Sequence, residues 1–189
     1  MDNPDLLKGT LVRLTAEDPK VIAETYVSWA KDSEYMRLLD ANVSAPVSVK
    51  KVIEWVEKDL EKNAPTEYYF LIRTLEDDRL VGAISLEGNL IAHAEAFVGI
   101  GIGERELWGK GYGTDAMRVI LRYAFSELTL RRVSLNTFEY NPRAIRSYEK
   151  VGFVHEGRVR GYLHRSGERW DLIFMGILRE EWLASQLKQ

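Results

Sequence analysis

The spacing of apolar residues predicts one strand and two helices at the start of the chain. Residues 10–15 alternate between polar and apolar side chains, which is typical of a strand with one buried face. Asp18 and the proline after it suit the start of a helix, and apolar residues recur at helical spacing from there to Trp29. Ser48 is placed to cap a second helix with its own apolar face.

Three further segments have the character of strands. Residues 68–74 and 80–86 are rich in apolar residues and are joined through an acidic turn, which predicts a hairpin. Residues 94–103 place apolar side chains on one face of a strand and glycines on the other, namely Gly99, Gly101 and Gly103. Glycine inside a strand indicates either a ligand close to the backbone or a strand packed closely under another element. Both interpretations stay open.

The second half of the chain alternates helices and strands. An amphipathic helix is expected over residues 114–127, followed by a strand over 132–138. Asn141 and the proline after it open a short helix. Two last strands are expected over about residues 154–160 and 170–177, before a polar tail. Helices mixed with hairpin-linked strands imply an α+β fold with a mixed sheet rather than a doubly wound parallel one.

The composition excludes several classes of function. With 189 residues, 46% of them hydrophobic, the chain is expected to form one domain over residues 1–189. It contains no cysteine, which excludes disulfides, thiolate metal ligands and a cysteine nucleophile. The net charge of −3 argues against nucleic acid as a partner. No segment has the length of a membrane span and the N-terminus is unlike a signal peptide, so a cytoplasmic protein without membrane contact is expected.

The glycine-rich segment Leu107–Thr114 carries the strongest chemical signal. Its glycines alternate with larger residues, directly after an apolar strand and directly before a helix. Glycine accepts a positive φ and has no Cβ, so such a loop can turn several backbone N–H groups toward one ligand. The positive end of the following helix dipole favours an anionic group there, such as a pyrophosphate. A tight turn without a ligand is the alternative.

Together with the segment Asn141–Phe153, this loop resembles the core of the GNAT family of N-acetyltransferases. The resemblance is strong over residues 94–155, and the Trp-Gly-Lys-Gly-Tyr-Gly-Thr form of the loop is similar to the ribosomal-protein acetyltransferase (RimJ/RimL-like) branch. It implies a GNAT fold, with a mixed, mostly antiparallel sheet of about seven strands flanked by about four helices. It also implies direct transfer of an acetyl group from acetyl-CoA to a primary amine, and a homodimer.

The same resemblance assigns the residues that bind acetyl-CoA. It implies that the pyrophosphate binds the loop amides, those of Trp108, Gly109, Lys110, Gly111, Tyr112, Gly113 and Thr114. It implies strand-like pairing of the pantetheine arm with the backbone of Ile100 and Ile102, and a Gly99 N–H that stabilises the oxyanion. Asn141 is expected to hydrogen-bond the cofactor arm, with capping of its own helix as the alternative or additional role.

The chain departs from the family's pattern within the loop. Glu106 stands where glutamine or arginine is usual. The neighbouring Arg105 is the expected substitute source of positive charge, and the amides that carry most of the binding are unaffected.

The resemblance also implies the catalytic residues. Tyr148 matches the tyrosine that is proposed to protonate the departing CoA sulfur in many members, and a phenol suits that task. A surface tyrosine on an amphipathic helix is the alternative. The general base is less well defined, because Asn136 stands where some N-terminal acetylases carry glutamate. Glu95 and then Glu87 are the candidate bases, with solvated surface charges as the alternative for both.

The expected acceptor is a protein or peptide N-terminus, and a small amine is the alternative. The form of the loop favours the N-terminal amine of a protein or peptide. Tyr148 and the negative net charge of the chain favour a small amine such as a polyamine, an amino acid analogue or an antibiotic. An interpretation from another class is a non-catalytic domain that binds acyl-CoA as a sensor. Tyr35, in a segment expected to be irregular, is the residue to test as an acceptor contact.

Other polar and aromatic residues are expected to be structural. Core packing explains Trp29 and Trp55. The three histidines lack the spacing of metal ligands, so no metal is expected. The basic stretch at residues 158–165 is expected to be a solvated strand face and turn. Its alternative is contact with the acceptor or with the 3′-phosphate of the nucleotide.

Overall fold

The computed structural model describes residues 5–60, 67–88 and 93–187. The strands are β1 (Val12–Thr15), β2 (Glu67–Thr74), β3 (Leu80–Glu87), β4 (Glu95–Ile102), β5 (Arg132–Phe138), β6 (Val154–Arg165) and β7 (Glu168–Leu178). The helices are α1 (Pro19–Trp29), α2 (Ser33–Leu39), α3 (Val49–Leu60), α4 (Tyr112–Arg122), α5 (Pro142–Val151) and α6 (Arg179–Gln186). A 3₁₀ turn, η1 (Arg105–Leu107), precedes α4, and a wide turn with π-helical spacing, η2 (Tyr123–Glu127), follows it.

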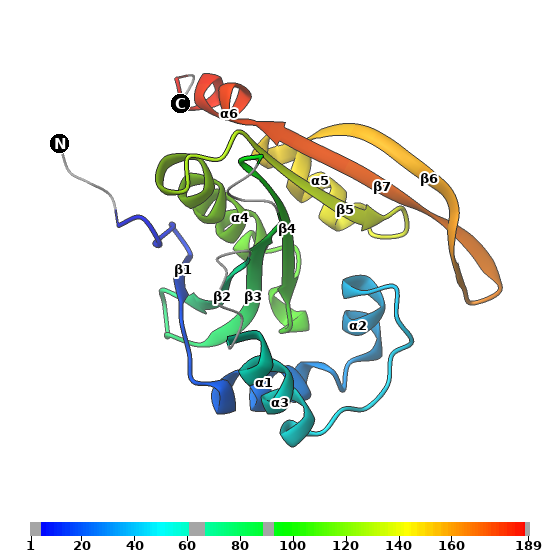
Figure 1. Cartoon of the computed structure of the whole chain (residues 1–189). Coiled ribbons are helices and arrows are strands. Elements are labelled where there is room, and N and C mark those ends of the chain that lie inside the picture. The colour runs from blue at the N-terminus through cyan, green and yellow to red at the C-terminus, as the bar shows by residue number, and fades with distance from the viewer. Residues whose placement is uncertain (1–4, 61–66, 89–92, 188–189) are drawn as a thin grey trace.

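The seven strands form one sheet in the order β1-β2-β3-β4-β5-β7-β6, drawn in Figure 1. All neighbouring strands are antiparallel except β4 and β5, which run parallel. The expected mixed, mostly antiparallel sheet is therefore confirmed. Within the described residues, no helix is long and apolar enough to cross a bilayer.

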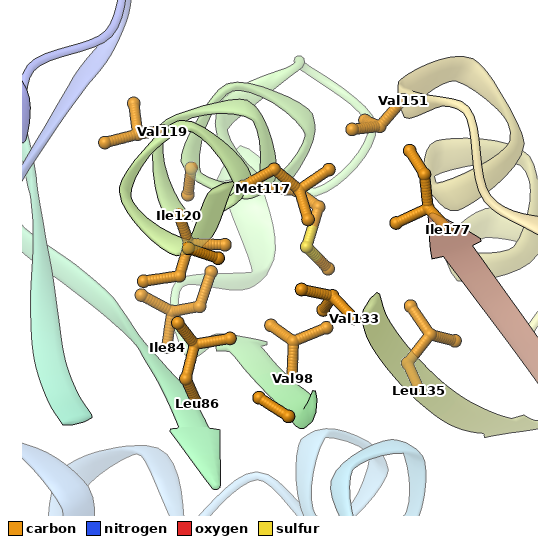
Figure 2. Packing of buried hydrophobic residues seen from close by; sticks show 14 of the residues in the cluster. Ile84, Leu86, Val98, Met117, Val119, Ile120, Val133, Leu135, Val151 and Ile177 are labelled. Atoms are coloured by element: carbon orange, nitrogen blue, oxygen red, sulfur yellow. The ribbon is translucent and has the colours of Figure 1, made fainter. Parts of the chain in front are cut away.

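The two faces of β4 pack against different helices, as the alternation of a strand requires. Ala96 and Val98 are buried in the core under α4, together with the apolar residues that Figure 2 shows around Met117. On the opposite face, a Cβ at Gly103 would lie 2.1 Å from the ring of Trp29, and one at Gly101 would lie 2.7 Å from the Tyr35 hydroxyl oxygen. These two glycines therefore allow α1 and α2 to pack directly on the strand.

A buried carboxylate attaches the start of β1 to the start of α4. Asp115 accepts hydrogen bonds from the backbone N–H groups of Thr10, Leu11 and Val12 at 3.2, 2.7 and 3.0 Å, and from the Thr10 hydroxyl at 3.0 Å. Each of these donors, if buried without a partner, would cost about 1–3 kcal/mol. Asp115 is also in the first turn of α4, where a negative charge is favourable. The helix that carries the glycine loop is thereby fixed to the sheet.

The parallel pair β4 and β5 separates after a short stretch. Their pairing runs from Glu95 with Arg132 to Phe97 with Ser134 and goes no further. Beyond that point β4 stays paired with β3 as far as Ile102, and β5 stays paired with β7 as far as Phe138. Each strand follows its antiparallel neighbour, so the sheet opens between them. We call this opening, beyond Phe97 and Ser134, the split.

The structure corrects three local expectations. The C-terminal tail is helical over α6, and its Trp182 packs on Phe125 with ring centroids 5.4 Å apart. The segment around Tyr35, expected to be irregular, is the helix α2, whose first turn is capped by the Asp32 carboxylate. Trp55 is 46% exposed rather than part of the core, and the Lys51 ammonium lies over its ring.

Candidate active site

A cavity of about 850 Å³ occupies the split and extends over the glycine loop and the first turns of α5. Its lining comes from α1, α2, β2, β3, β4, the loop before α4, the start of α4, β5, α5, β6 and β7. Of the sequence-predicted site residues, it brings together Gly99, Ile100, Ile102, Trp108, Gly109, Gly111, Gly113, Thr114, Asn141 and Tyr148. Lys110, Tyr112 and Glu95 are outside this lining.

Hydrogen bonding with β3 determines which way the backbone groups of β4 point. The Gly103 N–H donates to the Val81 carbonyl at 2.9 Å. In an antiparallel ladder, pairs that exchange hydrogen bonds alternate with pairs that do not. Gly99, paired with Ser85 and four residues from Gly103, therefore also directs its N–H toward β3. The expected use of the Gly99 N–H for an oxyanion is wrong for this reason.

The intervening residues of β4 point their backbone groups into the split. At the start of the strand, the Ala94 carbonyl accepts a hydrogen bond from the Arg131 N–H at 2.7 Å, so even-numbered residues face β5. By the same alternation the Val98 N–H completes the last β4–β5 pair, Phe97 with Ser134, and the N–H groups of Ile100 and Ile102 face the split, where β5 no longer pairs with them. Unpaired strand amides of this kind suit an extended ligand with its own amide groups.

The glycine loop has the conformation that its sequence predicts. Gly109 and Gly111 have φ values of +77° and +96°, in the left-handed region that favours glycine. Gly111 directly precedes α4, so the N–H groups of the first helical turn remain without intrahelical partners. The Trp108 indole N–H donates to the Ile102 carbonyl at 2.6 Å, which ties the loop to the end of β4.

The charges near the loop differ from expectation. Glu106 forms an ion pair with Arg79 at 2.5 Å, and neither residue lines the cavity. Arg105 does not supply the missing positive charge, because its guanidinium pairs with Asp32 at 2.5 Å and with Glu34 at the start of α2. The guanidinium of Arg143, on α5, lies 4.1 Å from the centroid of the Trp108 ring.

Basic residues that sequence reasoning missed line the cavity from α5. They are Arg143, Arg146 and Lys150. Burial lowers the pKa of Arg143, although an arginine stays charged at neutral pH. Their spacing of three and four positions along a helix was the available signal, since it places them on one face. The positive charge beside the loop therefore comes from α5.

One hydrogen bond caps α5, and a second joins it to the start of α4. The Asn141 side-chain oxygen accepts from the Ala144 N–H at 3.2 Å, so the capping role of Asn141 is confirmed. The hydroxyls of Thr114 and Ser147 are 2.7 Å apart and join the first turn of α4 to the middle of α5. Ser147 and Asn141 both line the cavity. The two helix ends and the split therefore surround one space.

Tyr148 lines the cavity from α5 and is supported by the core. Its ring centroid lies 6.1 Å from that of Phe153. Burial raises the pKa of the Tyr148 phenol to about 12. Below pH 10 the hydroxyl therefore stays protonated, which is the state that a proton donor requires.

The two candidate bases lie in different surroundings. Glu95 forms an ion pair with Arg131 at the surface, and the structure does not bring it to the cavity. Glu87 lines the cavity, and its carboxylate accepts a hydrogen bond from the Ser85 hydroxyl at 3.0 Å. Ser85 is paired with Gly99, so Glu87 reaches the same part of the split. Asn136 lines the cavity from β5.

The wall opposite α5 is rich in tyrosine. Tyr26, Tyr35, Tyr69 and Tyr162 line it, and Asp40 at the end of α2 adds a carboxylate. Burial raises the pKa of Tyr69 to about 12 and that of Tyr35 still further, so both stay neutral. This wall presents hydroxyl groups, ring faces and negative charge.

The basic stretch at residues 158–165 is mostly exposed on β6, as expected, but two of its arginines are also engaged within the protein. Arg158 pairs with Glu139 at 2.7 Å and with Asp171 at 2.8 Å. Arg165 binds backbone carbonyl groups at the end of α2. Among the described residues, no group of acidic or histidine side chains is arranged to hold a metal ion.

The comparisons with known proteins agree with this geometry. A family model described as acetyltransferase (GNAT) domain matches residues 10–154. YokL, an SPbeta prophage-derived uncharacterized N-acetyltransferase of Bacillus subtilis, is 31% identical over 156 residues, which span 79% of this chain and 81% of that protein. YdaF, a putative ribosomal N-acetyltransferase of the same species, is 36% identical over 108 residues, or 57% of this chain and 58% of YdaF.

A solved structure extends the likeness to the whole fold. The crystal structure of spermidine N-acetyltransferase from Vibrio cholerae, in complex with CoA and spermine, has a TM-score of 0.80 at 25% identity, over 91% of this chain and 98% of that chain. The fold and the loop thus define a transferase that uses acyl-CoA. The chain belongs to the GNAT family of N-acetyltransferases. It is an enzyme with acetyl-CoA as donor, which leaves the sensor interpretation without support.

Gly111 tests the loop. Gly111→Val places a branched side chain at a φ of +96°, so it distorts the backbone that presents the amides. We expect acetyl-CoA affinity, measured by isothermal titration calorimetry, to fall at least about 30-fold, with far-UV circular dichroism unchanged. Gly157→Val is the matched control, because a Cβ at Gly157 meets no atom within 4 Å and its φ is not positive. Normal acetyl-CoA affinity in Gly111→Val would contradict the role of the loop in binding acetyl-CoA.

Proposed function

We propose that this enzyme acetylates a primary amine of a small, extended, cationic acceptor of the polyamine class. The distribution of charge in the cavity carries the proposal. Its carboxylates, Asp40 and Glu87, lie away from α5, whereas the basic residues of the described lining all belong to α5. The basic side suits the phosphates of acetyl-CoA, and the acidic, tyrosine-rich side suits an ammonium group.

The chain's own groups fit acetyl-CoA without rearrangement. The N–H groups of Ile100 and Ile102 face the split and are placed to pair with the amides of the pantetheine arm. The loop from Trp108 to Thr114 and the start of α4 provide N–H donors for the pyrophosphate. Asn141 uses its oxygen for the cap, which leaves its NH₂ group as a donor to the arm.

One side chain would act on the thioester during transfer. The Tyr148 hydroxyl would deliver a proton to the sulfur as the carbon–sulfur bond breaks. The amine would attack the acetyl carbon directly, since a chain without cysteine cannot form a cysteinyl acyl-enzyme.

Glu87 is the base that the cavity offers. An acceptor ammonium must lose a proton before its nitrogen can attack, and Glu87 is the carboxylate next to the Ser85–Gly99 pair. Ser85 would hold the carboxylate in position, and a water molecule would carry the proton. Glu95, fixed to Arg131, has no such access.

A protein or peptide N-terminus is the second candidate acceptor. The RimJ/RimL-like form of the loop and the similarity to YdaF favour it. A homodimer and a cytoplasmic location stay predictions. A molecular mass in solution equal to that of a single chain would contradict the homodimer.

A panel of amines distinguishes the acceptors. CoA release from acetyl-CoA is followed with a thiol-reactive dye, for which a protein without cysteine gives no background. We expect spermidine and spermine to be used with kcat/KM at least about tenfold above that for peptides starting with alanine or serine. Release with peptides alone would contradict the polyamine proposal and support the second candidate. No release with any amine, despite acetyl-CoA binding, would contradict both.

Tyr148→Phe tests the proton donor. Loss of the hydroxyl should lower kcat by about 100-fold and change the Kd of acetyl-CoA by less than about twofold. Because the pKa is raised to about 12, the deficit should be the same at pH 7 and pH 9.5. Tyr123→Phe serves as the control, since Tyr123 packs on Tyr68 and Phe70 outside the cavity. Unchanged turnover in Tyr148→Phe would assign the proton to another donor.

Glu87→Gln and Glu95→Gln test the base as a pair. At pH 7.5 we expect Glu87→Gln to lower kcat/KM for spermidine about tenfold or more. This loss of kcat/KM should become smaller toward pH 10, because about half of a free amine is neutral there and needs no base. Glu95→Gln should behave as wild type throughout. A lower kcat/KM in Glu95→Gln alone would contradict Glu87 as the general base and support Glu95 in that role.

A further inference from the structure

One guanidinium, that of Arg165 at the end of β6, binds a set of carbonyl groups at the end of α2. Its Nη1 donates to the Arg37 carbonyl at 2.5 Å. Its Nη2 lies 3.2, 3.3 and 3.1 Å from the carbonyl oxygens of Asp40, Ala41 and Asn42. Figure 1 shows the paired strands β6 and β7 continuing beyond the rest of the sheet, so the arginine is carried by a projecting hairpin.

The chemistry of the contact is that of a helix C-terminus. The last carbonyl groups of a helix have no intrahelical partner, and a cation there is favoured by the helix dipole. The guanidinium has several donors in a fixed plane, so one side chain can serve several carbonyls. A helix of seven residues such as α2 is not stable alone. Its position therefore depends on contacts of this kind.

Aromatic residues hold the arginine in place. The Tyr140 hydroxyl accepts from Arg165 at 2.7 Å and itself donates to the Arg37 carbonyl at 2.7 Å. Tyr140 stacks on Phe138, with centroids 5.1 Å apart, and meets Trp170 edge-on. The Trp170 indole N–H donates to the Arg165 carbonyl at 3.2 Å. We call Arg165 and Tyr140, with the carbonyls that they bind, the clasp.

The clasp lies directly behind one wall of the cavity. Leu38, Leu39, Asp40 and Ala41 line the cavity, and the carbonyls of two of these residues are bound by Arg165. The opposite end of α2 is held by Arg105, through Asp32 and Glu34. Removing Arg165 would release only the end of α2 that carries Asp40.

We propose that Arg165 is a positioning residue that sets the place of the acceptor wall, and with it the affinity for the amine, from outside the cavity lining. This rests on the proposed function, because Asp40 and the tyrosine-rich wall are assigned to the acceptor there. The loop, α4 and α5 do not contact the clasp through any of its hydrogen bonds. Acetyl-CoA binding is therefore independent of it.

Arg165→Met removes the donors and keeps much of the apolar stem. With spermidine as the probe, we expect KM for the amine to rise about tenfold or more, while the Kd of acetyl-CoA stays within about twofold. Arg165→Lys, with one ammonium in place of the planar fork, should recover part of the affinity. Arg169→Met is the matched control from the same hairpin, where the arginine reaches only the Gly161 carbonyl, and should leave KM unchanged.

A second measurement keeps this proposal separate from the proposed function. Amide hydrogen exchange over residues 37–42 should be faster in Arg165→Met than in wild type, with residues 108–114 unchanged. If no amine is acetylated, faster exchange still supports the clasp while the proposed function fails. Unchanged KM or unchanged exchange would overturn the clasp. If Arg165→Met does not fold, Tyr140→Phe tests the same prediction with a smaller rise in KM, and an unchanged KM there overturns it.

Discussion

The divergence of β4 and β5 is the constraint on which the site depends. Two parallel strands pair for three residues and then follow different antiparallel neighbours, so a sheet that is otherwise continuous opens in its middle. The opening leaves the backbone N–H groups of Ile100 and Ile102 and the carbonyl of Ile100 without ladder partners. Such groups need partners, and an extended ligand with amides of its own can provide them.

The two sides of the split are stabilised in different ways. On one side, α4 is packed into the core by Met117, Ile120 and their neighbours, shown in Figure 2, and fixed to β1 by Asp115. On the other side, α2 is short and is held at its ends by Arg105 and Arg165. The cofactor side is therefore fixed by packing in the core behind it, and the acceptor side is positioned by polar contacts. Polar contacts are the more readily altered by substitution, which fits a family whose members differ in acceptor.

Much of the fold could be predicted from the sequence, because periodicity and turn residues are local signals. The strands, the glycine loop and the helix opened by Asn141 were predicted close to their observed bounds. The helix α2 was missed because its stability comes from distant arginines, and α6 was missed because its polar sequence hides one packed tryptophan. Trp55 was wrongly placed in the core, since an aromatic at helical spacing does not reveal whether another element covers it.

The site was predictable only in part, for a geometric reason. The loop and the position of Tyr148 follow from motifs, but the direction of a strand amide depends on register. One residue of difference separates Gly99, whose N–H faces β3, from Ile100, whose N–H faces the split. Likewise, no local pattern distinguishes Glu95, paired with Arg131, from Glu87, which reaches the cavity. The resemblance to the GNAT family, which the comparisons confirm, identified the activity, and long-range contacts decide which groups serve it.

The most direct measurement is residue-resolved amide hydrogen exchange, by NMR, with and without CoA. The N–H groups of Ile100 and Ile102 should become strongly protected when CoA binds, because the cofactor arm takes the place of a neighbouring strand. Those of Gly99 and Gly101, already bonded to β3, should change little. Protection at the two glycines, or none at the two isoleucines despite binding, would contradict the claim that the split receives the cofactor.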